Sequence, residues 1–281
     1  MSFSSHPEIA RWQSAQTLHR VAHEGRTVCW HQFGQGAPLV LLHGGHGNWM
    51  HWIRNIEALA RQHTLLIPDL PGFGESDELA HDPHAPDRIE ALVRAVLASL
   101  NALTGDHAPI DLAGFSFGGL VAAQLAARRS HVRRLALLGT AGHGGARREK
   151  APMVNCRVGE RAERLAGLRH NLRVFMLHDE GQMDDLSLAV HETACVQTRF
   201  RSKALSRSGQ IQPVLATLAA PTLLLWGEHD VTAQPDIVGP QLAASHPAHQ
   251  WRVIPDAGHW VQYEQAQETN RVLQNWFAPD D

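Results

Sequence analysis

"DLAGFSFGGLVAA", residues 111–123, places Ser116 between Gly114 and Gly118 and guides the interpretation of the whole chain. The apolar residues before Ser116 are typical of a buried strand, and the alanine- and leucine-rich run after it is typical of a helix. A sharp strand-to-helix turn exposes its serine, and the glycines leave room for the backbone. Gly-x-Ser-x-Gly is a short pattern, so the choice between a nucleophile and a small turn residue depends on the surrounding sequence.

Strand patterns alternate with helix patterns along most of the chain. Residues 17–34 alternate around the turn "HEG" and predict an antiparallel hairpin. Residues 87–103 and 117–129 have the apolar spacing of helices. Together these segments predict an α/β fold in which a mostly parallel, eight-stranded sheet is flanked by helices. Six further short apolar runs are typical of strands covered on both faces: "APLVLLHGG" (37–45), "HTLLIPDLPG" (63–72), "APIDLAGFS" (108–116), "VRRLALLGTAG" (132–142), "PTLLLWGEHD" (221–230) and "QWRVIPDAGH" (250–259).

One long segment interrupts this alternation. From residue 142 to residue 212 the chain is rich in arginine and leucine and contains no buried-strand pattern. Connections of this length are uncommon inside compact domains unless they carry structure of their own. We therefore expect residues 1–141 and 213–281 to form the core and residues 142–212 to form a helical cap insertion.

Three chemically capable residues follow predicted strands in the order serine, aspartate, histidine. Functional groups gather beyond the carboxyl ends of strands in open parallel sheets. A serine hydroxyl needs a base to accept its proton and a carboxylate to orient that base, which assigns Ser116 as nucleophile, His259 as base and Asp230 as acid. Asp69 belongs to the "PDLPGFGESD" turn and Asp256 lies three residues before His259, so Asp230 is the preferred acid.

Two backbone amides are candidates for the oxyanion hole. The amide of Phe117 lies at the predicted start of a helix, directly after the nucleophile. A second amide, at Gly45 in the "HGG" loop, would complete the pair. His43 opens this loop, and we expect it to brace the loop by hydrogen bonds.

Five segments together resemble the α/β-hydrolase superfamily: "LLHGG", "PDLPGFGESD", "GFSFGG", "LLLWGEHD" and "AGHW". The resemblance covers nearly the whole chain and implies the α/β-hydrolase fold and a serine hydrolase. Haloalkane dehalogenases and epoxide hydrolases of this fold use aspartate at the nucleophile position, so Ser116 argues against both.

A narrower resemblance links the chain to the meta-cleavage-product hydrolases, which cut a carbon–carbon bond in ring-fission diketones. It rests on "LLHGGHGNWMHWIRNIEALA", "LLGTAGHGG" and "AGHWVQYEQAQETNRVLQNWF". The resemblance implies that Trp260 pairs with a cap arginine to hold the substrate carboxylate, and Arg199 and Arg201 lie in the corresponding part of the cap.

The chain departs from this family at two places. "HGGHGN" lacks the family's proline and places His46 near the oxyanion loop, and Phe115 stands where the family tends to have asparagine. Because these departures touch groups near the reacting carbon, we favour hydrolysis of a small carboxylic ester. Trp49 is expected to be a further wall of the pocket. Carbon–carbon hydrolysis is the main alternative, and lactone, thioester and amide substrates stay open. A non-catalytic binder of small molecules on the same fold is a further alternative.

Composition narrows the class of partner. Lys and Arg total 25 against 28 for Asp and Glu, so the net charge of -3 gives no reason to expect nucleic acid or an anionic membrane as partner. The cysteines at 29, 156 and 195 are scattered and no span of about 18 apolar residues occurs, so we expect a cytoplasmic protein. A small-molecule substrate is expected, and a homodimer stays open.

We expect neither a cofactor nor a metal. The loop "HDPHAPD" at 81–87 offers His81, Asp82, His84 and Asp87, but a metal site normally needs ligands from a second element as well. Most of the twenty histidines are expected to be solvated.

Overall fold

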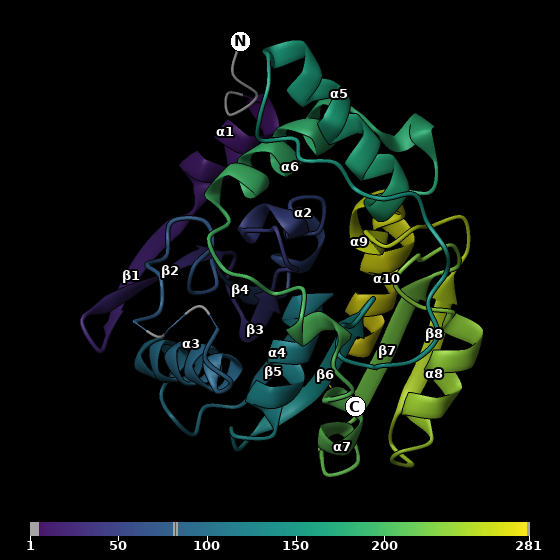
Figure 1. The fold of residues 1–281 in the computed structure, drawn as a ribbon. Helices are drawn as coiled ribbons and strands as arrows, with labels where there is room; N and C mark the ends of the chain where they lie inside the picture. Colours follow the sequence, from purple (N-terminus) through teal and green to yellow (C-terminus); the bar gives the residue numbers. More distant parts are fainter. Residues whose placement is uncertain (1–5, 81, 83, 280–281) are drawn as a thin grey trace.

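The computed structural model describes residues 6–80, 82 and 84–279 (Figure 1). Within these residues, eight strands form one sheet. Its strand order is β1-β2-β4-β3-β5-β6-β7-β8. The sheet confirms the predicted fold. The strands are β1 (Thr17–His23), β2 (Arg26–Phe33), β3 (Ala37–Leu42), β4 (His63–Pro68), β5 (Ile110–Phe115), β6 (Val132–Leu138), β7 (Thr222–Gly227) and β8 (Gln250–Ile254).

The sheet is antiparallel at one edge and parallel elsewhere. Strands β1 and β2 form the predicted hairpin, and β2 pairs antiparallel with β4. From β4 to β8 every pair is parallel. In the central pair, Leu42 of β3 lies opposite Gly114 of β5. The loop after β3 and the turn after β5 therefore leave the sheet side by side.

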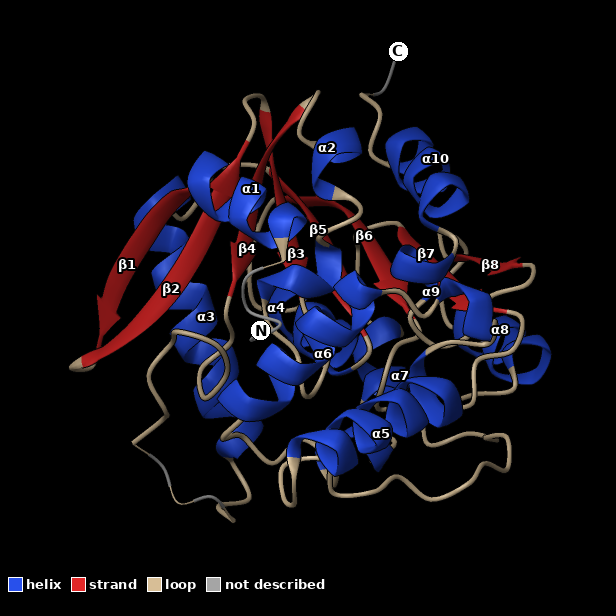
Figure 2. Ribbon diagram, turned by 90° about the horizontal axis from the view of Figure 1, so that it is seen from above, coloured by secondary structure: helices blue, strands red, loops and turns tan. Residues whose placement is uncertain are grey.

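Helices cover both faces of the sheet, each over its own hydrophobic core (Figure 2). Helices α1 (Pro7–Ala15), α2 (Ile56–Leu59) and α10 (Ala266–Trp276) lie on one face. Helices α3 (Arg88–Thr104), α4 (Phe117–Ala126) and α8 (Pro235–Ala243) lie on the other. Helix α10 shows why such segments fold here, since it buries Val272 and Leu273 while its other face stays polar. The short helices η2 (Trp49–Trp52) and α9 (Val261–Glu264) complete this part of the fold.

The sequence pattern does not predict α1. This helix has nine residues, of which only Ile9 and Trp12 are buried, so its apolar stripe is too short to stand out. Its start is marked by Pro7 and by the ring of His6, which accepts a hydrogen bond from the amide of Glu8.

The segment between β6 and β7 contains helices and no strand among the described residues. Helices α5 and α6 lie together at the top of the molecule in Figure 1. Residues 143–160 contain no helix, and Pro152 and Gly159 lie among them. None of the described helices has the length and apolarity that a membrane crossing requires. The helices of the segment are α5 (Arg161–Asn171), the π-helical η3 (Leu172–Met176), η4 (Glu180–Gln182), α6 (Asp185–Gln197), η5 (Leu205–Arg207) and α7 (Ile211–Leu215).

Candidate active site

Ser116 occupies a strained turn between β5 and α4. Its φ of 53° lies in the left-handed region that non-glycine residues rarely adopt. The turn is held because the Ser116 amide donates to the carbonyl of Leu138, 2.8 Å away. A Cβ at Gly114 would lie 2.3 Å from the carbonyl oxygen of Gly118, and a Cβ at Gly118 would lie 2.3 Å from that of His43. Both glycines are therefore required by the close approach of three backbone segments.

The structure brings Ser116, His259 and Asp230 together. Nε2 of His259 lies 2.9 Å from the Ser116 hydroxyl oxygen, and its Nδ1 lies 2.9 Å from Oδ2 of Asp230. His259 and Asp230 are buried, whereas Ser116 is half-buried. The three side chains come from the ends of β5, β7 and β8, which is where the parallel sheet gathers functional groups.

Asp230 is held as a carboxylate by its neighbours. Burial alone would raise its pKa, but the charge and hydrogen bond of His259, together with Thr232, keep the pKa below its usual range. The amide and the hydroxyl of Thr232 donate to Oδ1 at 2.7 and 2.8 Å. Oδ2 is thus left for His259.

The other acids considered from the sequence lie elsewhere. Asp69 is buried and accepts from the amides of Trp49 and Glu75, at 2.9 and 2.8 Å, so it braces a turn. Asp256 is exposed at the end of β8.

The loop after β3 lies against the serine turn. A Cβ at Gly44 would lie 3.2 Å from Cβ of Ser116, and one at Gly45 would lie 3.7 Å from Cβ of Phe117. His43 has both ring nitrogens occupied, because Nδ1 donates to the Gly44 carbonyl at 2.8 Å and Nε2 accepts from an amide on the loop after β4 at 3.0 Å. His43 therefore braces the loop.

The amides of Gly45 and Phe117 are left available in this arrangement. The Gly44 amide donates to Nδ1 of His51, 3.2 Å away. Within the described part of the chain, neither the Gly45 nor the Phe117 amide donates to another protein group. Two neighbouring, unengaged amides beside a serine hydroxyl suit the stabilisation of a developing oxyanion.

Two of the expected pocket residues are neighbours of His259. Phe115 is a neighbour in space, and Trp260 follows His259 in the sequence. The ring of Phe115 is 4.9 Å from that of His259, between centroids. Trp260 is fully buried, stacks on Tyr263 at 4.1 Å and donates its indole N–H to the carbonyl of His51 at 3.0 Å. This indole N–H is therefore engaged within the protein.

The other two expected pocket residues, Trp49 and His46, differ in burial. Trp49 is buried, and its ring stacks on His31 at 5.0 Å and packs near Phe33 at 5.8 Å, in the core of the α1 face. His46, with a φ of 51°, follows the oxyanion loop and is exposed.

The two cap arginines contact residues of the segment between β4 and α3. Arg199 donates to the carbonyl of Ser76 at 2.6 Å and pairs with Glu78 at 3.6 Å, on the turn after β4. Arg201 is exposed, with its guanidinium 3.3 Å from Nε2 of His84.

Several residues that shape the site are not evident from the sequence. Thr232 has a weak signal, because it stands two residues after Asp230, the spacing of an Asx turn. The sequence gives no signal for Phe175. Its ring lies 5.2 Å from that of His259 because the fold brings η3 close to this histidine. Glu264 accepts from the amides of Gly258 and His178, at 2.6 and 2.8 Å, and so ties the loop before His259 to the segment after η3.

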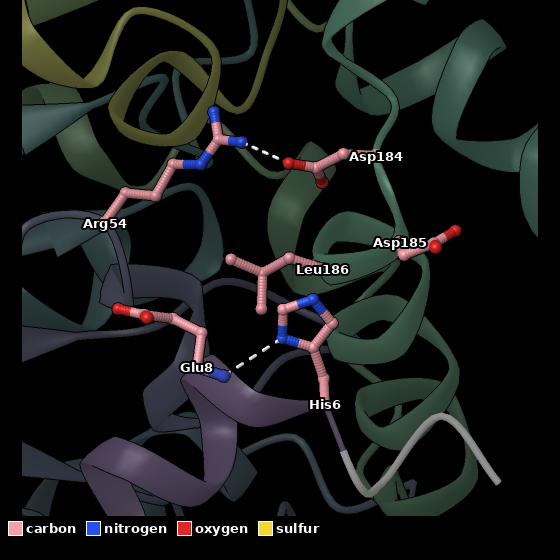
Figure 3. Close-up of a pocket in the computed structure, with 6 residues that line it drawn as sticks. All are labelled: His6, Glu8, Arg54, Asp184, Asp185 and Leu186. Carbon is pink, nitrogen blue, oxygen red and sulfur yellow. Dashed lines mark hydrogen bonds and ion pairs between the residues drawn. The ribbon is translucent and has the colours of Figure 1, made fainter. Parts of the chain in front are cut away.

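A surface pocket lies away from this site. A hollow of about 510 Å³ lies at the start of α1 and α6. Figure 3 shows its lining side chains, among which Arg54 pairs with Asp184. The hydroxyl of Tyr263 donates to the same carboxylate at 2.5 Å. Arg54 and Asp184 are thus paired with each other, and none of Ser116, Asp230 and His259 lines the hollow. Its lining residues are His6, Glu8, Arg54, Asp184, Asp185 and Leu186.

Three side chains that could bind a metal ion lie close together just after β7 and β8. Ligand atoms of Glu228, His229 and Asp256 lie within 4.8 Å of one another at the ends of β7 and β8. Glu228 already accepts from the Asp256 amide at 3.3 Å, so a structural role accounts for part of this cluster. His81, which was considered as a ligand, lies outside the described residues, and Asp82 caps a turn by accepting from the amide of His84 at 2.6 Å. The expectation of no metal and no cofactor stays a prediction.

Comparisons with known proteins agree with this fold. Over 261 residues the chain is 31% identical to a 2-hydroxy-6-oxo-6-phenylhexa-2,4-dienoate hydrolase of Burkholderia cepacia, covering 87% of this chain and 89% of that protein. Two solved structures share the fold. Carboxylesterase CesB of Bacillus subtilis has a TM-score of 0.78 at 19% identity, covering 98% of this chain and 95% of CesB. The meta-cleavage product hydrolase CumD of Pseudomonas fluorescens has a TM-score of 0.71 at 24% identity, covering 92% of this chain and 97% of CumD. Residues 39–272 match the sequence model of the Alpha/beta hydrolase family, and the chain belongs to that family.

Proposed function

We propose that Ser116, His259 and Asp230 form the catalytic triad of a serine hydrolase that cleaves a small carboxylic ester. The observation that carries this proposal is the unbroken chain of contacts from the Ser116 hydroxyl through both nitrogens of His259 to Asp230, each 2.9 Å long. A base within hydrogen-bond reach of a hydroxyl, and itself oriented by a buried carboxylate, is the arrangement that activates serine.

The geometry supports the following steps. Asp230 accepts from Nδ1–H of His259, which leaves Nε2 unprotonated and facing the Ser116 hydroxyl. As Ser116 attacks the substrate carbonyl, its proton passes to Nε2 and later to the leaving alcohol. The amides of Gly45 and Phe117 stabilise the oxyanion. A water molecule, deprotonated by His259, then releases the acid from the acyl-enzyme.

Three residues favour an ester over a ring-fission diketone. The resemblance to meta-cleavage-product hydrolases implies a clamp of Trp260 and a cap arginine. Here the Trp260 indole N–H donates to the carbonyl of His51, and Arg199 donates to the carbonyl of Ser76 on the turn after β4. Phe115 adds an apolar ring beside His259.

Carbon–carbon hydrolysis is the second candidate. It is favoured by the identity of 31% over 87% of this chain with a protein named for hydrolysis of a hydroxy-oxo-dienoate. The same triad would serve this reaction, with a tautomerisation step before cleavage.

We also propose that residues 142–212 act as a cap on a core formed by residues 1–141 and 213–281. The contact between the rings of Phe175 and His259, 5.2 Å apart, supports this division because it brings the segment directly onto the site. A small-molecule substrate and a reducing cytoplasm, as expected for scattered cysteines, belong to the same proposal.

The test is the ratio of two rates on the purified protein. Nitrophenol release from a short-chain nitrophenyl ester reports ester hydrolysis, and bleaching of a yellow ring-fission dienoate reports carbon–carbon cleavage. We expect the ester to react and Ser116→Ala to abolish the reaction. A dienoate rate that exceeds the ester rate by orders of magnitude would assign the second candidate, and no turnover of either would favour a non-catalytic binder.

A further inference from the structure

Two cysteines that are far apart in the sequence lie in contact in the segment between β6 and β7. Cys156 is on the irregular chain before α5, and Cys195 is near the end of α6. Both side chains are buried in the same hydrophobic core. Their thiols share a hydrogen bond, and both are free rather than joined in a disulfide. The fold therefore pairs two reduced thiols from separate elements.

Fixed contacts hold the chain around Cys156. The side-chain amide of Asn171, at the end of α5, donates to the carbonyl of Val154 and accepts from the Val154 amide, each at 2.9 Å. A Cβ at Gly167 of α5 would lie 3.1 Å from Cβ of Cys156. Cys156 thus packs against α5 while its thiol contacts Cys195 of α6, so the pairing of the two thiols is built into the packing of the segment.

The two thiols differ in how readily they ionise. The hydrogen bond with Cys195 lowers the pKa of the Cys156 thiol, and the side chain of Asn171 and the charge of Arg157 act in the same direction, against the effect of burial. The same hydrogen bond and burial raise the pKa of Cys195. Cys156 is therefore the thiolate of the pair and Cys195 is its hydrogen-bond donor. The thiolate is the form of cysteine that reacts with oxidants.

Cys29 provides an internal contrast. Its Sγ accepts from the Arg20 guanidinium at 3.2 Å and donates to the carbonyl of Glu75 at 3.3 Å. Burial raises the pKa of Cys29 to about 11. Cys29 is 0% exposed, whereas Cys156 is 9% exposed and stands between two exposed residues. A small oxidant should therefore react with Cys156 in preference to Cys29.

We infer that Cys156 and Cys195 form an oxidisable dithiol that reacts with a hydroperoxide and closes to a disulfide between the chain before α5 and α6. The Cys156 thiolate attacks one oxygen of hydrogen peroxide. An S–O bond forms, the O–O bond breaks and hydroxide leaves, so that Cys156 is oxidised to a sulfenic acid and the peroxide is reduced. Cys195 then attacks this sulfur, an S–S bond replaces the S–O bond, and the oxygen leaves with the Cys195 proton as water.

The disulfide would restrain a part of α6 that contacts the loop after β3. Bond formation brings the two sulfur atoms to about 2.05 Å, and Cys156 can make this approach because no helix or strand contains it. Gln197, two residues after Cys195, accepts from the side-chain amide of Asn48 at 3.2 Å. In a reducing compartment such a bond is transient and forms in response to oxidant. The inference does not depend on the proposed ester hydrolysis.

The experiment treats the reduced native protein with hydrogen peroxide, blocks the remaining thiols with iodoacetamide and maps tryptic peptides by mass spectrometry. Trypsin places the two cysteines on separate peptides, residues 151–157 and 174–199. We expect these peptides to become linked within one chain and to separate again in dithiothreitol. Before oxidation, iodoacetamide should modify Cys156 at least about tenfold faster than Cys29.

Three serine variants assign the roles. Cys195→Ser removes the second thiol, so the sulfenic acid on Cys156 should persist and be trapped by dimedone. Cys156→Ser should give no dimedone adduct, and the control Cys29→Ser should form the linked peptides as fast as the native protein. The inference is overturned by a link that involves Cys29, by a link between two chains, or by oxidation of Cys156 while Cys195 stays free. Alkylation of Cys156 no faster than that of Cys29 also overturns it.

Discussion

The indole N–H of Trp260 donates to the backbone carbonyl of His51, 3.0 Å away, and joins the loop after the triad histidine to η2. An indole has one N–H, so this bond commits the donor of Trp260 to the protein. The ring of His51 lies 5.2 Å from that of Trp260, while its Nδ1 accepts from Gly44. His51 thus connects the loop that carries His259 to the oxyanion loop.

His51 should act as a positioning residue for the oxyanion loop. His51→Ala leaves the Gly44 amide without its acceptor, so we expect kcat to fall about tenfold with little change in KM, less than the direct loss of an oxyanion donor. His51→Asn, whose carbonyl can accept from the same amide, should restore part of the loss. Steady-state kinetics on the reactive ester measures both.

A matched control separates this effect from instability. His249 is also buried, and its Nε2 lies 3.0 Å from the Leu215 carbonyl, away from the triad. His249→Ala should lower the melting temperature and leave kcat unchanged. If both alanine variants reduce kcat equally, His51 has only a structural role.

Asp230→Asn should reduce kcat by roughly 10⁴ while the fold is kept. Asparagine can present an N–H toward Nδ1 of His259, which would move the imidazole proton to Nε2 and remove the acceptor for Ser116. Thr232→Val removes only the hydroxyl donor to Asp230, and the Thr232 amide stays at 2.7 Å, so its effect should be within about tenfold. An Asp230→Asn enzyme with more than a tenth of the native rate would remove Asp230 from the triad.

Stability should fall in mild acid because of buried histidines. Burial lowers the pKa of both His43 and His191 from 6.5 to about 4. Between these values the unfolded chain binds protons that the folded chain excludes, so the contribution of each neutral ring is complete above pH 6.5 and is lost as the pH falls toward 4. Each group accounts for about 3 kcal/mol of this loss.

His191→Leu tests that account by urea unfolding at several pH values. His191 is 3% exposed and has weak contacts, with Cys195 Sγ 3.8 and 3.9 Å from its ring nitrogens. The variant should lose less stability between pH 7 and pH 5 than the native protein, and His107→Leu, at an exposed position, should not differ from native. Parallel curves for His191→Leu and native protein would contradict the assignment.

The parallel sheet and the grouping of Ser116, Asp230 and His259 follow from local patterns. Runs such as "TLLLWG" and "IDLAGF" are apolar over a strand's length and end at a chemically capable residue, so both strand and site could be recognised. Ser116, Asp230 and His259 then come together because parallel strands end at one edge of the sheet.

The pocket depends on tertiary contacts that local patterns do not encode. Trp49 and Trp260 are both tryptophans close to motif residues in the sequence. In the structure Trp49 packs in the core against His31, whereas the indole N–H of Trp260 donates to the carbonyl of His51. Arg199 is drawn outward by the carbonyl of Ser76 and by Glu78, more than a hundred positions earlier in the chain. Residues 143–160 form irregular chain, although the sequence pattern favoured helix there.

The central claim, that Ser116 is a nucleophile activated by His259, is tested most directly by a fluorophosphonate probe. The site of modification is located by mass spectrometry in the native protein and in His259→Ala. We predict one adduct on Ser116 and a labelling rate that falls about 10²-fold or more in His259→Ala. A folded native protein that stays unlabelled, or that is labelled at another serine, would contradict the claim.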